Sequence, residues 1–248
     1  MCIRDRYSIY ADRKRHLAKE WNLGYGISYR FAKDRDFQTY DKVTGDIPTE
    51  NTDSRLREQT ANFYVSLSRN YATGTSVSVS ATGEYYTIGS YRKWAVYPQA
   101  SLTYVKSPKH LFQLSLSTDK TYPGYWDMQS SVSHLNGYTE LWGTPGLKPS
   151  TTYNLNGNYI WKQKYIFGLF FMHTSDFFVQ TGYQSTDRLA LIYKNTNWNY
   201  MQMWGANIIL PFKAGNWLDS RLTLVGMQVH QRCDDFFDIP FNLSLIHI

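Results

Sequence analysis

One short segment near the C-terminus gathers side chains that could bind a metal ion. In "HQRCDDFFD", the candidate ligands are His230, Cys233, Asp234, Asp235 and Asp238. Imidazole, thiolate and carboxylate groups are common metal ligands, but this spacing fits neither a standard zinc pattern nor an EF-hand loop. We therefore interpret the segment as a solvated loop and expect no metal site there.

A second acidic segment, "KDRDFQTYDKVTGD", could offer carboxylates to calcium. Lys33, Arg35 and Lys42 interleave with those carboxylates, so their charges oppose the binding of a cation. We interpret this segment as a loop as well. Across the chain, we expect no bound metal.

Motifs for catalysis are absent from the sequence. It has no Gly-x-Ser-x-Gly elbow, no His-Glu-x-x-His pair and no glycine loop that could cradle a phosphate. His110 and His173 are isolated in sequence, and a lone histidine is usually structural. We therefore expect no enzyme activity and no cofactor.

Five aromatic side chains lie in the long polar segment between Asp119 and Ser150. Their flat rings and polar atoms could stack on a sugar or a chelate. The alternative is that they pack within the loop, where prolines set the turns. As a weak ligand-contact site for an unknown extracellular ligand, the candidates are Tyr122, Tyr125, Trp126, Tyr138 and Trp142.

Composition limits the class of protein. The formal net charge of +6 is mild, and Lys and Arg lie mainly in turns and loops, so we expect no nucleic-acid partner. Aromatic residues make up 17% of the chain, yet the mean hydropathy is −0.48. No run approaches the roughly 18 apolar residues that a membrane helix needs. A polar chain rich in aromatics indicates either a soluble all-β protein or a membrane β-barrel.

Alternation with a period of two dominates the sequence. In "WNLGYGISYRF", the large apolar residues from Trp21 to Phe31 share one parity, and Asn, Gly, Ser and Arg share the other. This pattern predicts a strand with one apolar and one polar face. It recurs in "ANFYVSL", "SVSVSATG", "ASLTY", "FQLSLST", "YNLNGNYIW" and "SRLTLVGMQ". We count about nine or ten strands, and no helical period competes with them.

The connections between these strands alternate in length. The short ones are the basic stretch around Asp12–Lys19 and the segments "NYATGT", "KSPKH", "KQK" and "KAGN". The long ones are 32–58, the shorter 87–93, 119–150, 182–197 and the tail from His230. Membrane barrels have short periplasmic turns and long extracellular loops, whereas Greek-key sandwiches mix the two ends. The pattern favours an antiparallel up-and-down meander.

Large aromatic residues lie beside the short connections, where rings in a barrel would meet the membrane–water interface. The alternative is ordinary packing at the hairpin ends of a soluble sheet. As membrane-interface aromatics, we predict Trp21, Tyr104, Trp161, Tyr165, Phe212 and Trp217.

The polar faces support the membrane interpretation. Serines and asparagines such as Ser78, Asn154 and Asn156 would cost free energy in a dry core without hydrogen-bond partners. In a barrel they line a wet lumen, and the apolar faces meet lipid. We therefore expect an all-β fold, an open, curved part of a transmembrane β-barrel, with the lipid bilayer as a partner.

Two longer stretches carry a family resemblance. They read "VYPQASLTYVKSPKHLFQLSLSTDKTYPGYWDM" and "GTPGLKPSTTYNLNGNYIWKQKYIFGLFF". Together they resemble the outer-membrane β-barrel family of Bacteroidetes-type bacteria, which belongs with the TonB-dependent receptors. That family has Arg-Pro-x-Tyr-Trp-Asp where 122–127 reads "YPGYWD", and Gly-Asn-Pro-x-Leu-Lys-Pro-Glu where 143–150 reads "GTPGLKPS". Thr144 and Ser150 depart from the family pattern, but the turn-forming prolines are kept.

The resemblance implies an energised uptake receptor in the cell outer membrane of a Gram-negative bacterium. Such a receptor has a barrel of roughly 22 strands, a plug domain inside it and an energising protein of the TonB type as partner. Neither a plug nor a TonB-contacting segment is present in these residues. The alternatives are a passive porin or structural barrel, and a secreted, soluble β-rich module that binds glycans.

The two ends of the sequence have a peculiarity at the DNA level. "MCIRDR" and "LSLIHI" back-translate to reverse complements, as expected for the ends of a sequencing adapter. We therefore predict that 1–6 and 243–248 are adapter-derived and that 7–242 is the outer-membrane β-barrel segment. The alternative is a true start methionine and a true C-terminus.

Overall fold

The computed structural model describes residues 2–39, 51–236 and 239–247. Over these ranges the chain folds into two β-sheets and two single turns of 3-10 helix, η1 (Ala18–Glu20) and η2 (Trp126–Met128). None of the helices in the described part of the chain is long and apolar enough to cross a membrane. The predicted all-β class is confirmed.

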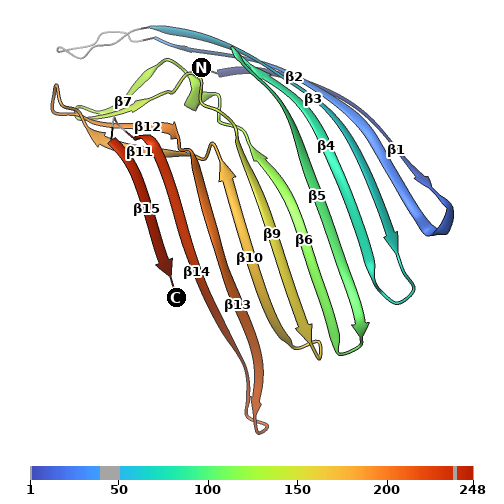
Figure 1. Cartoon of the computed structure of the whole chain (residues 1–248). Coiled ribbons are helices and arrows are strands. Elements are labelled where there is room, and N and C mark those ends of the chain that lie inside the picture. Colours follow the sequence, from blue (N-terminus) through green and yellow to red (C-terminus); the bar gives the residue numbers. More distant parts are fainter. Residues whose placement is uncertain (1, 40–50, 237–238, 248) are drawn as a thin grey trace.

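The larger sheet contains eleven strands within the described residues, all antiparallel to their neighbours and in sequence order apart from the strands that lie in loops. This is the predicted up-and-down meander (Figure 1). Its strands are β1 (Cys2–His16), β2 (Trp21–Gln38), β3 (Thr52–Asn70), β4 (Ser76–Ile88), β5 (Tyr91–Ser107), β6 (His110–Thr121), β9 (Ser150–Trp161), β10 (Tyr165–Ser175), β13 (Tyr200–Ala214), β14 (Leu218–Phe236) and β15 (Ile239–His247).

The register of the strands keeps the apolar residues on the same face of the sheet from one strand to the next. Tyr25 pairs with Val65, Val65 pairs with Ala81, and Ala81 pairs with Pro98. Because directly opposed residues share a face of the sheet, the apolar side chains of all these strands lie on one surface. That surface is open: Leu169, for example, is 70% exposed.

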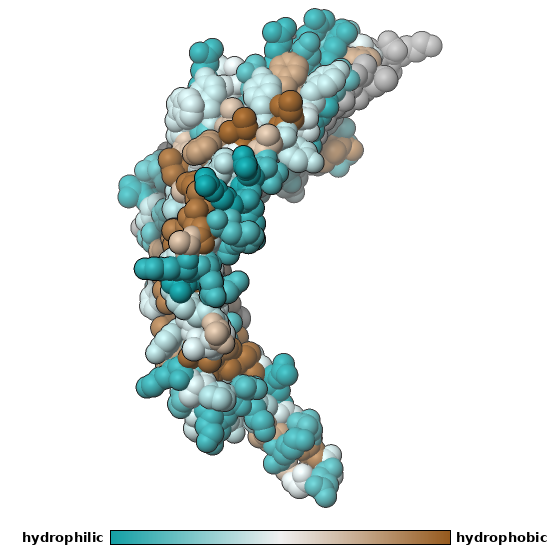
Figure 2. Space-filling view, turned by 90° about the vertical axis from the view of Figure 1, so that its right-hand side faces the viewer, coloured by the Kyte–Doolittle hydropathy of each residue, from teal (hydrophilic) through white to brown (hydrophobic). Residues whose placement is uncertain are grey.

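The sheet is strongly curved and open, with β1 and β15 as its two edges (Figure 1). Viewed from the side, the molecule is an arc with one hollow face (Figure 2). The polar parity faces the hollow side, where the long connections fold onto it. The expectation of an open, curved sheet is confirmed.

The sequence underestimates the strands near the two edges. The basic stretch expected to form a turn mostly continues β1 to His16, and the tail from His230 expected to be a loop continues β14 to Phe236. Charged residues hide both extensions from a search for apolar alternation. Within the described residues the larger sheet has eleven strands, whereas the sequence predicts about nine or ten.

Two of the connections expected to be long are shorter than predicted. Strand β2 continues to Gln38 and β3 begins at Thr52, which shortens the expected loop at 32–58 from both sides. The connection at 87–93 is a tight turn of Gly89 and Ser90, and Gly89 has a φ of +55° that favours glycine.

The two remaining long connections are structured. They contribute β7 (Val132–Asn136), β8 (Thr139–Trp142), β11 (Phe178–Gln184) and β12 (Leu191–Asn197) to a small second sheet, in the order β11-β12-β8-β7. In this sheet β12 pairs with β8 in parallel, which ties the β10–β13 connection to the β6–β9 connection. The small sheet lies at the end of the wall opposite the short turns (Figure 1).

The predicted junctions at 6/7 and 242/243 lie inside β1 and β15. The fold has no boundary at either place, and the predicted adapter origin of 1–6 and 243–248 stays a prediction.

Candidate functional site: the loop end of the hollow face

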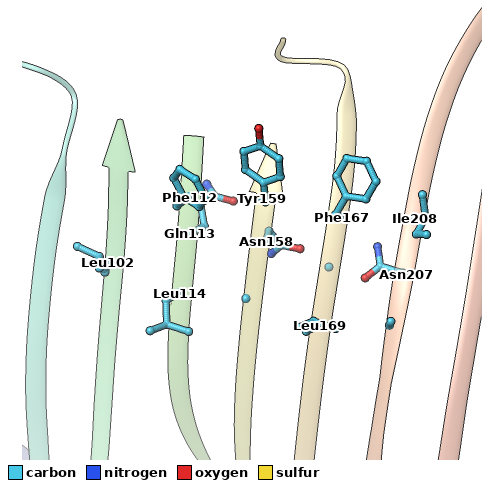
Figure 3. Close-up of a pocket in the computed structure, with 13 residues that line it drawn as sticks. Leu102, Phe112, Gln113, Leu114, Asn158, Tyr159, Phe167, Leu169, Asn207 and Ile208 are labelled. Atoms are coloured by element: carbon cyan, nitrogen blue, oxygen red, sulfur yellow. The ribbon is translucent and has the colours of Figure 1, made fainter. Parts of the chain in front are cut away.

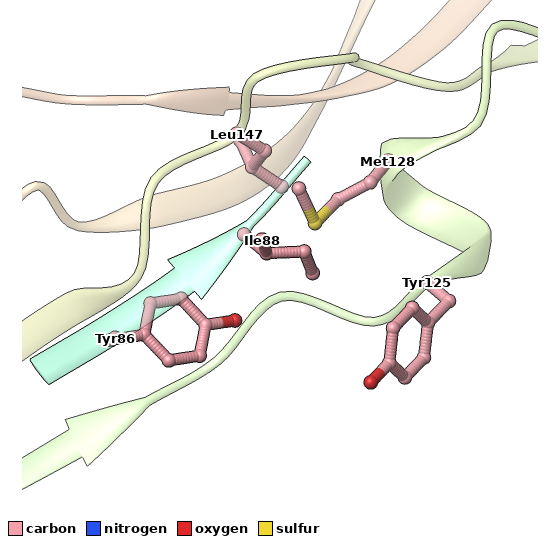
Figure 4. Close-up of a cluster of buried hydrophobic side chains, with 5 residues drawn as sticks. All are labelled: Tyr86, Ile88, Tyr125, Met128 and Leu147. Carbon is pink, nitrogen blue, oxygen red and sulfur yellow. The ribbon is translucent and has the colours of Figure 1, made fainter. Parts of the chain in front are cut away.

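The β6–β9 connection packs onto the hollow face of the wall through a small apolar cluster. Tyr86 and Ile88 come from β4, and the connection contributes Tyr125, Met128 and Leu147. Figure 4 shows Met128 and Leu147 reaching toward Ile88 from two separate parts of the connection. The connection is therefore fixed against the wall and is not a free loop.

Two buried carboxylates, Glu58 and Glu84, lie beside this cluster, and each is 5% exposed. Glu58 of β3 accepts a hydrogen bond from the Tyr125 hydroxyl, and its Oε1 lies 3.4 Å from Nη2 of Arg30. Burial of a carboxylate is costly unless a cation and hydrogen-bond donors compensate it. Arg30 and Tyr125 supply that compensation, one from the wall and one from the connection.

The second carboxylate, Glu84 of β4, is held in the same way. The Tyr122 hydroxyl donates to its Oε2 at 2.6 Å, and Oε1 accepts from Tyr97 at 3.4 Å and from the Lys120 ammonium. Glu84 is thus compensated by one cation and two phenols, and Tyr122 belongs to the connection.

Lys120 reaches Glu84 because β6 separates from β5 at this level. The two strands pair only as far as Ala100 and Leu116, and beyond that point β6 pairs with β9 alone. The Lys120 ammonium lies 4.3 Å from the ring centroid of Tyr86 and 4.7 Å from that of Tyr122. These cation–π contacts stabilise a lysine whose side chain is only 8% exposed.

The pKa of Tyr122, just beyond the end of β6, is changed by its position in this site. Burial raises the pKa of its phenol, and the adjacent Glu84 carboxylate raises it further. Both effects disfavour the phenolate. The hydroxyl therefore stays protonated and able to donate to Glu84.

A second set of hydrogen bonds ties the two long connections together. Asn195 of β12 donates from Nδ2 to Oδ1 of Asp127 at 2.8 Å, and the Thr144 hydroxyl donates to the Asn195 carbonyl at 2.6 Å. Asn197 accepts from the Lys148 amide at 2.8 Å. Thr144, one of the two departures from the family pattern, thus has a role in joining the connections.

A third buried carboxylate, Glu140 of β8, lies inside the small sheet. Arg188 donates to its Oε2 at 2.6 Å, and the Trp142 indole donates to the same oxygen at 2.8 Å. His134 lies 3.7 Å from the other oxygen. Trp142 is thereby fixed within the sheet.

The five predicted ligand-contact residues do not form one exposed surface. Tyr122 and Tyr125 fasten the connection to the wall, and Trp142 bonds within the small sheet. Trp126 and Tyr138 remain open, at 47% and 65% exposure. Packing within the loop, the alternative interpretation, describes Trp142, whereas Tyr122 and Tyr125 pack against the wall. Ligand contact stays a prediction, and the exposed Trp126 and Tyr138 fit it best.

The predicted interface aromatics all lie near the short turns. Tyr104, Phe212 and Trp217 are exposed, with Trp217 at 82%, and Trp161 packs against Tyr165 in a tilted arrangement with ring centroids 5.2 Å apart. Trp21 lies 5.9 Å from the Arg69 guanidinium. Their positions agree with a girdle at one end of the wall, and the membrane-interface role stays a prediction.

The two segments weighed as metal sites lie in strands for the most part. His230, Cys233 and Asp234 belong to β14, where Cys233 is buried and Asp234 pairs with Arg232 at 2.7 Å. Of the second acidic segment, 33–38 belong to β2, and 40–46 lie outside the described residues, as does Asp238. Over the part of the chain that is described, no group of three or more His, Cys, Asp or Glu residues is arranged to hold a metal ion.

Sequence reasoning missed the four charged residues at the centre of this site: Arg30, Glu58, Glu84 and Lys120. Three of them interrupt strands at positions of the polar parity close to a long connection. The alternation of the strands does not distinguish a buried ion pair at such a position from a solvated side chain, so the sequence carries no signal for this site.

These features define a class of protein. A curved meander has one open apolar face and one polar face, short turns at one end and structured loops at the other, which is the wall of an outer-membrane β-barrel. The chain belongs to the outer membrane protein beta-barrel family, whose model matches residues 3–244. It is therefore a protein of the outer membrane.

Solved structures share the fold. The siderophore receptor PirA from Pseudomonas aeruginosa is 10% identical, with a TM-score of 0.58 over 98% of this chain and 48% of its own. A mutant of the ferric enterobactin receptor PfeA from Pseudomonas aeruginosa, in complex with enterobactin, is 12% identical, with a TM-score of 0.59 over 99% of this chain and 41% of its own. The copper transporter OprC is 13% identical, with a TM-score of 0.56 over 95% of this chain and 42% of its own.

This chain thus spans less than half the length of these solved proteins. They are receptors and a transporter, not enzymes. No curated protein matches the sequence.

Proposed function

We propose that this chain is part of the wall of a TonB-dependent receptor that takes up an unidentified ligand through the outer membrane. The observation that carries the proposal is the fold: the sheet follows receptor and transporter barrels over nearly its whole length, although the sequence identities are low. In such a receptor the wall would enclose a plug domain, and an energising protein of the TonB type would drive uptake.

The loop end of the hollow face supports a receptor over an open pore. A passive porin needs a wide, water-filled lumen. Here the β6–β9 connection folds inward and is fixed to the wall at Glu58 and Glu84. The exposed Trp126 and Tyr138 on the loops leave aromatic surface for a ligand that arrives from outside. The outer-membrane family removes the secreted, soluble module from consideration.

The test is the complete coding sequence across both ends of this segment. A receptor requires an upstream plug domain with a TonB-contacting segment and further alternating strands. A complete frame that holds strands but no plug would refute the receptor and leave the passive porin or structural barrel. Uptake by cells expressing the complete protein, with and without a proton uncoupler, then tests energised transport directly.

A further inference from the structure

The outer apolar face of the wall has a groove that nothing in the receptor proposal uses. It has a volume of about 560 Å³ and is centred on Gly157 of β9, between Leu114 of β6 and Leu169 of β10. Gly157 directly opposes both leucines and has no side chain, so the surface is hollow between them. Figure 3 shows these leucines on the strands at either side of β9.

A row of aromatic rings closes the groove on the side of the short turns. Ring centroids of Phe112 and Tyr159 lie 4.8 Å apart, and those of Tyr159 and Phe167 lie 6.0 Å apart (Figure 3). The Tyr159 hydroxyl lies 2.7 Å from Nδ1 of His110. Rings that are apolar on the body and polar at the tip are typical of the membrane–water interface.

Four exposed lysines lie just beyond this row, at two short turns that touch. The Lys162 amide donates to the Lys109 carbonyl at 2.7 Å, and Gln163 donates to the Pro108 carbonyl at 3.2 Å. Lys109, Lys162 and Lys164 lie in the turns themselves, and Lys106 lies at the end of β5. Within the described residues, none of the four ammonium groups forms an ion pair.

The distance between the groove and the lysines matches the hydrocarbon depth of one leaflet of a bilayer. Gly157 precedes Trp161, the last residue of β9, by four residues, which is about 14 Å along the strand, and Lys162 follows directly. One leaflet of a bilayer has a hydrocarbon depth of about 15 Å, half of the whole core. A lipid whose phosphate meets the lysines would therefore lay an acyl chain past the aromatic row and into the groove.

We propose that this groove and the four lysines form a binding site for one anionic phospholipid of the membrane leaflet at the short-turn end. The acyl chain fills the hollow at Gly157, and the headgroup phosphate lies among the ammonium groups. Charge complementarity selects an anionic lipid, because a zwitterionic headgroup brings its own cation to the same place.

The molecule offers a matched control. A second apolar groove of about 530 Å³ lies on the same outer face around Gly83 of β4, bordered by Ala61, Phe63 and Trp94. Its lining includes Ile9 and Ala11 of β1, and Arg13 follows on the same face of that strand. The two grooves therefore resemble each other in size and polarity, but the second lies beside arginine of β1 and not beside the four lysines.

Both grooves can be filled without disturbing the backbone. A Cβ at Gly157 would meet only the Leu114 Cδ1 at 3.8 Å, and a Cβ at Gly83 would meet only the Phe63 carbonyl oxygen at 3.8 Å. These are ordinary contacts. Gly157→Phe and Gly83→Phe thus add one lipid-facing ring each to the outer surface.

The experiment is native mass spectrometry of the complete protein released from nanodiscs that contain equal amounts of phosphatidylglycerol and phosphatidylethanolamine. We expect the wild type to retain phosphatidylglycerol preferentially, Gly157→Phe to lose it and Gly83→Phe to keep it. Replacement of Lys106, Lys109, Lys162 and Lys164 by Gln should lower the ratio of the two retained lipids about five-fold or more, since one lysine near anionic lipid contributes about that factor. Heat-modifiable migration in gels confirms that each variant is folded.

Two results would overturn the proposal. Equal retention of the two phospholipids by the wild type would show that the site does not select the headgroup. Equal retention of phosphatidylglycerol by Gly157→Phe and Gly83→Phe would show that the groove at Gly157 does not hold the lipid. Neither of these results bears on uptake, so the receptor proposal is tested separately.

Discussion

The attachment of the β6–β9 connection to the wall can be tested with conservative substitutions of two tyrosines. Tyr122→Phe and Tyr125→Phe each remove one hydroxyl and keep the ring. The first deletes the hydrogen bond to Glu84, and the second deletes the hydrogen bond to Glu58. The rings still pack against the wall, and both carboxylates keep their cations, so each variant reports on a single hydrogen bond.

A hydrogen bond to a charged partner contributes about 1.5–3 kcal/mol, and a buried carboxylate that loses a donor pays part of its desolvation cost again. If attachment of the connection is a local equilibrium, its opening becomes easier by this amount. A factor of ten corresponds to about 1.4 kcal/mol. Amide exchange in the connection should therefore rise about ten- to hundred-fold in each variant, and by more in the double variant.

Hydrogen exchange of the complete protein, followed by mass spectrometry of the peptides that cover 122–149, measures this change. Tyr138→Phe is the matched control, because it removes the same hydroxyl from the same connection at a side chain that is 65% exposed. Peptides from β9 and β10 should exchange alike in all variants. If Tyr122→Phe and Tyr125→Phe exchange no faster than Tyr138→Phe, the two carboxylates do not hold the connection.

Three further predictions concern the loops and turns. Gly143→Ala should loosen the same connection, because a Cβ there would lie 2.0 Å from the Gln129 carbonyl oxygen. Gly137→Ala is the control, since a Cβ at that position meets nothing within 4 Å. Limited proteolysis of the two variants measures the difference. The pKa of Tyr122 is raised on folding, so the contribution of its hydroxyl to attachment is complete below pH 10 and falls as the pH rises further. Amide hydrogen exchange at 122–149 should therefore accelerate more with rising pH in the wild type than in Tyr122→Phe. Gln163 has a φ of +55°, so Gln163→Gly should be about 1 kcal/mol more stable than Gln163→Ala, which loses the same hydrogen bond to the Pro108 carbonyl. Thermal unfolding of the two variants measures the difference.

The alternation of apolar and polar residues was enough to predict the wall. From Trp21 to Phe31, and again in β3, β4 and β9, the pattern alone assigns the strand and its outer face, because a side-chain period of two leaves no other regular structure. The same alternation also predicts where most of the short turns lie. It fails where charges replace apolar residues, as at the end of β1 and in β14, and where a turn has only two residues, as at Gly89.

The attachment site was beyond sequence reasoning for a different reason. Glu58 and Glu84 lie 26 residues apart, and the tyrosines that reach them lie farther along the chain. Only the fold brings them together. The aromatic motif "YPGYWD" is a ligand-contact candidate in the sequence, but in the fold Tyr122 and Tyr125 turn toward the wall and Trp126 turns outward. Periodicity could not decide between these directions, since the segment lies outside the regular strands.

The hollow face therefore has two different environments on the same strands. Toward the short turns, its serines and asparagines remain partly exposed, as a wet lumen requires. Toward the loops, the same parity carries Glu58, Thr60, Glu84 and Tyr86, all nearly closed to solvent by the β6–β9 connection. A buried carboxylate is costly unless it is compensated, so the cations and tyrosine hydroxyls around Glu58 and Glu84 are needed to keep this part of the wall closed. A connection held in this way presents a defined surface at the loop end of the wall, as the receptor proposal requires.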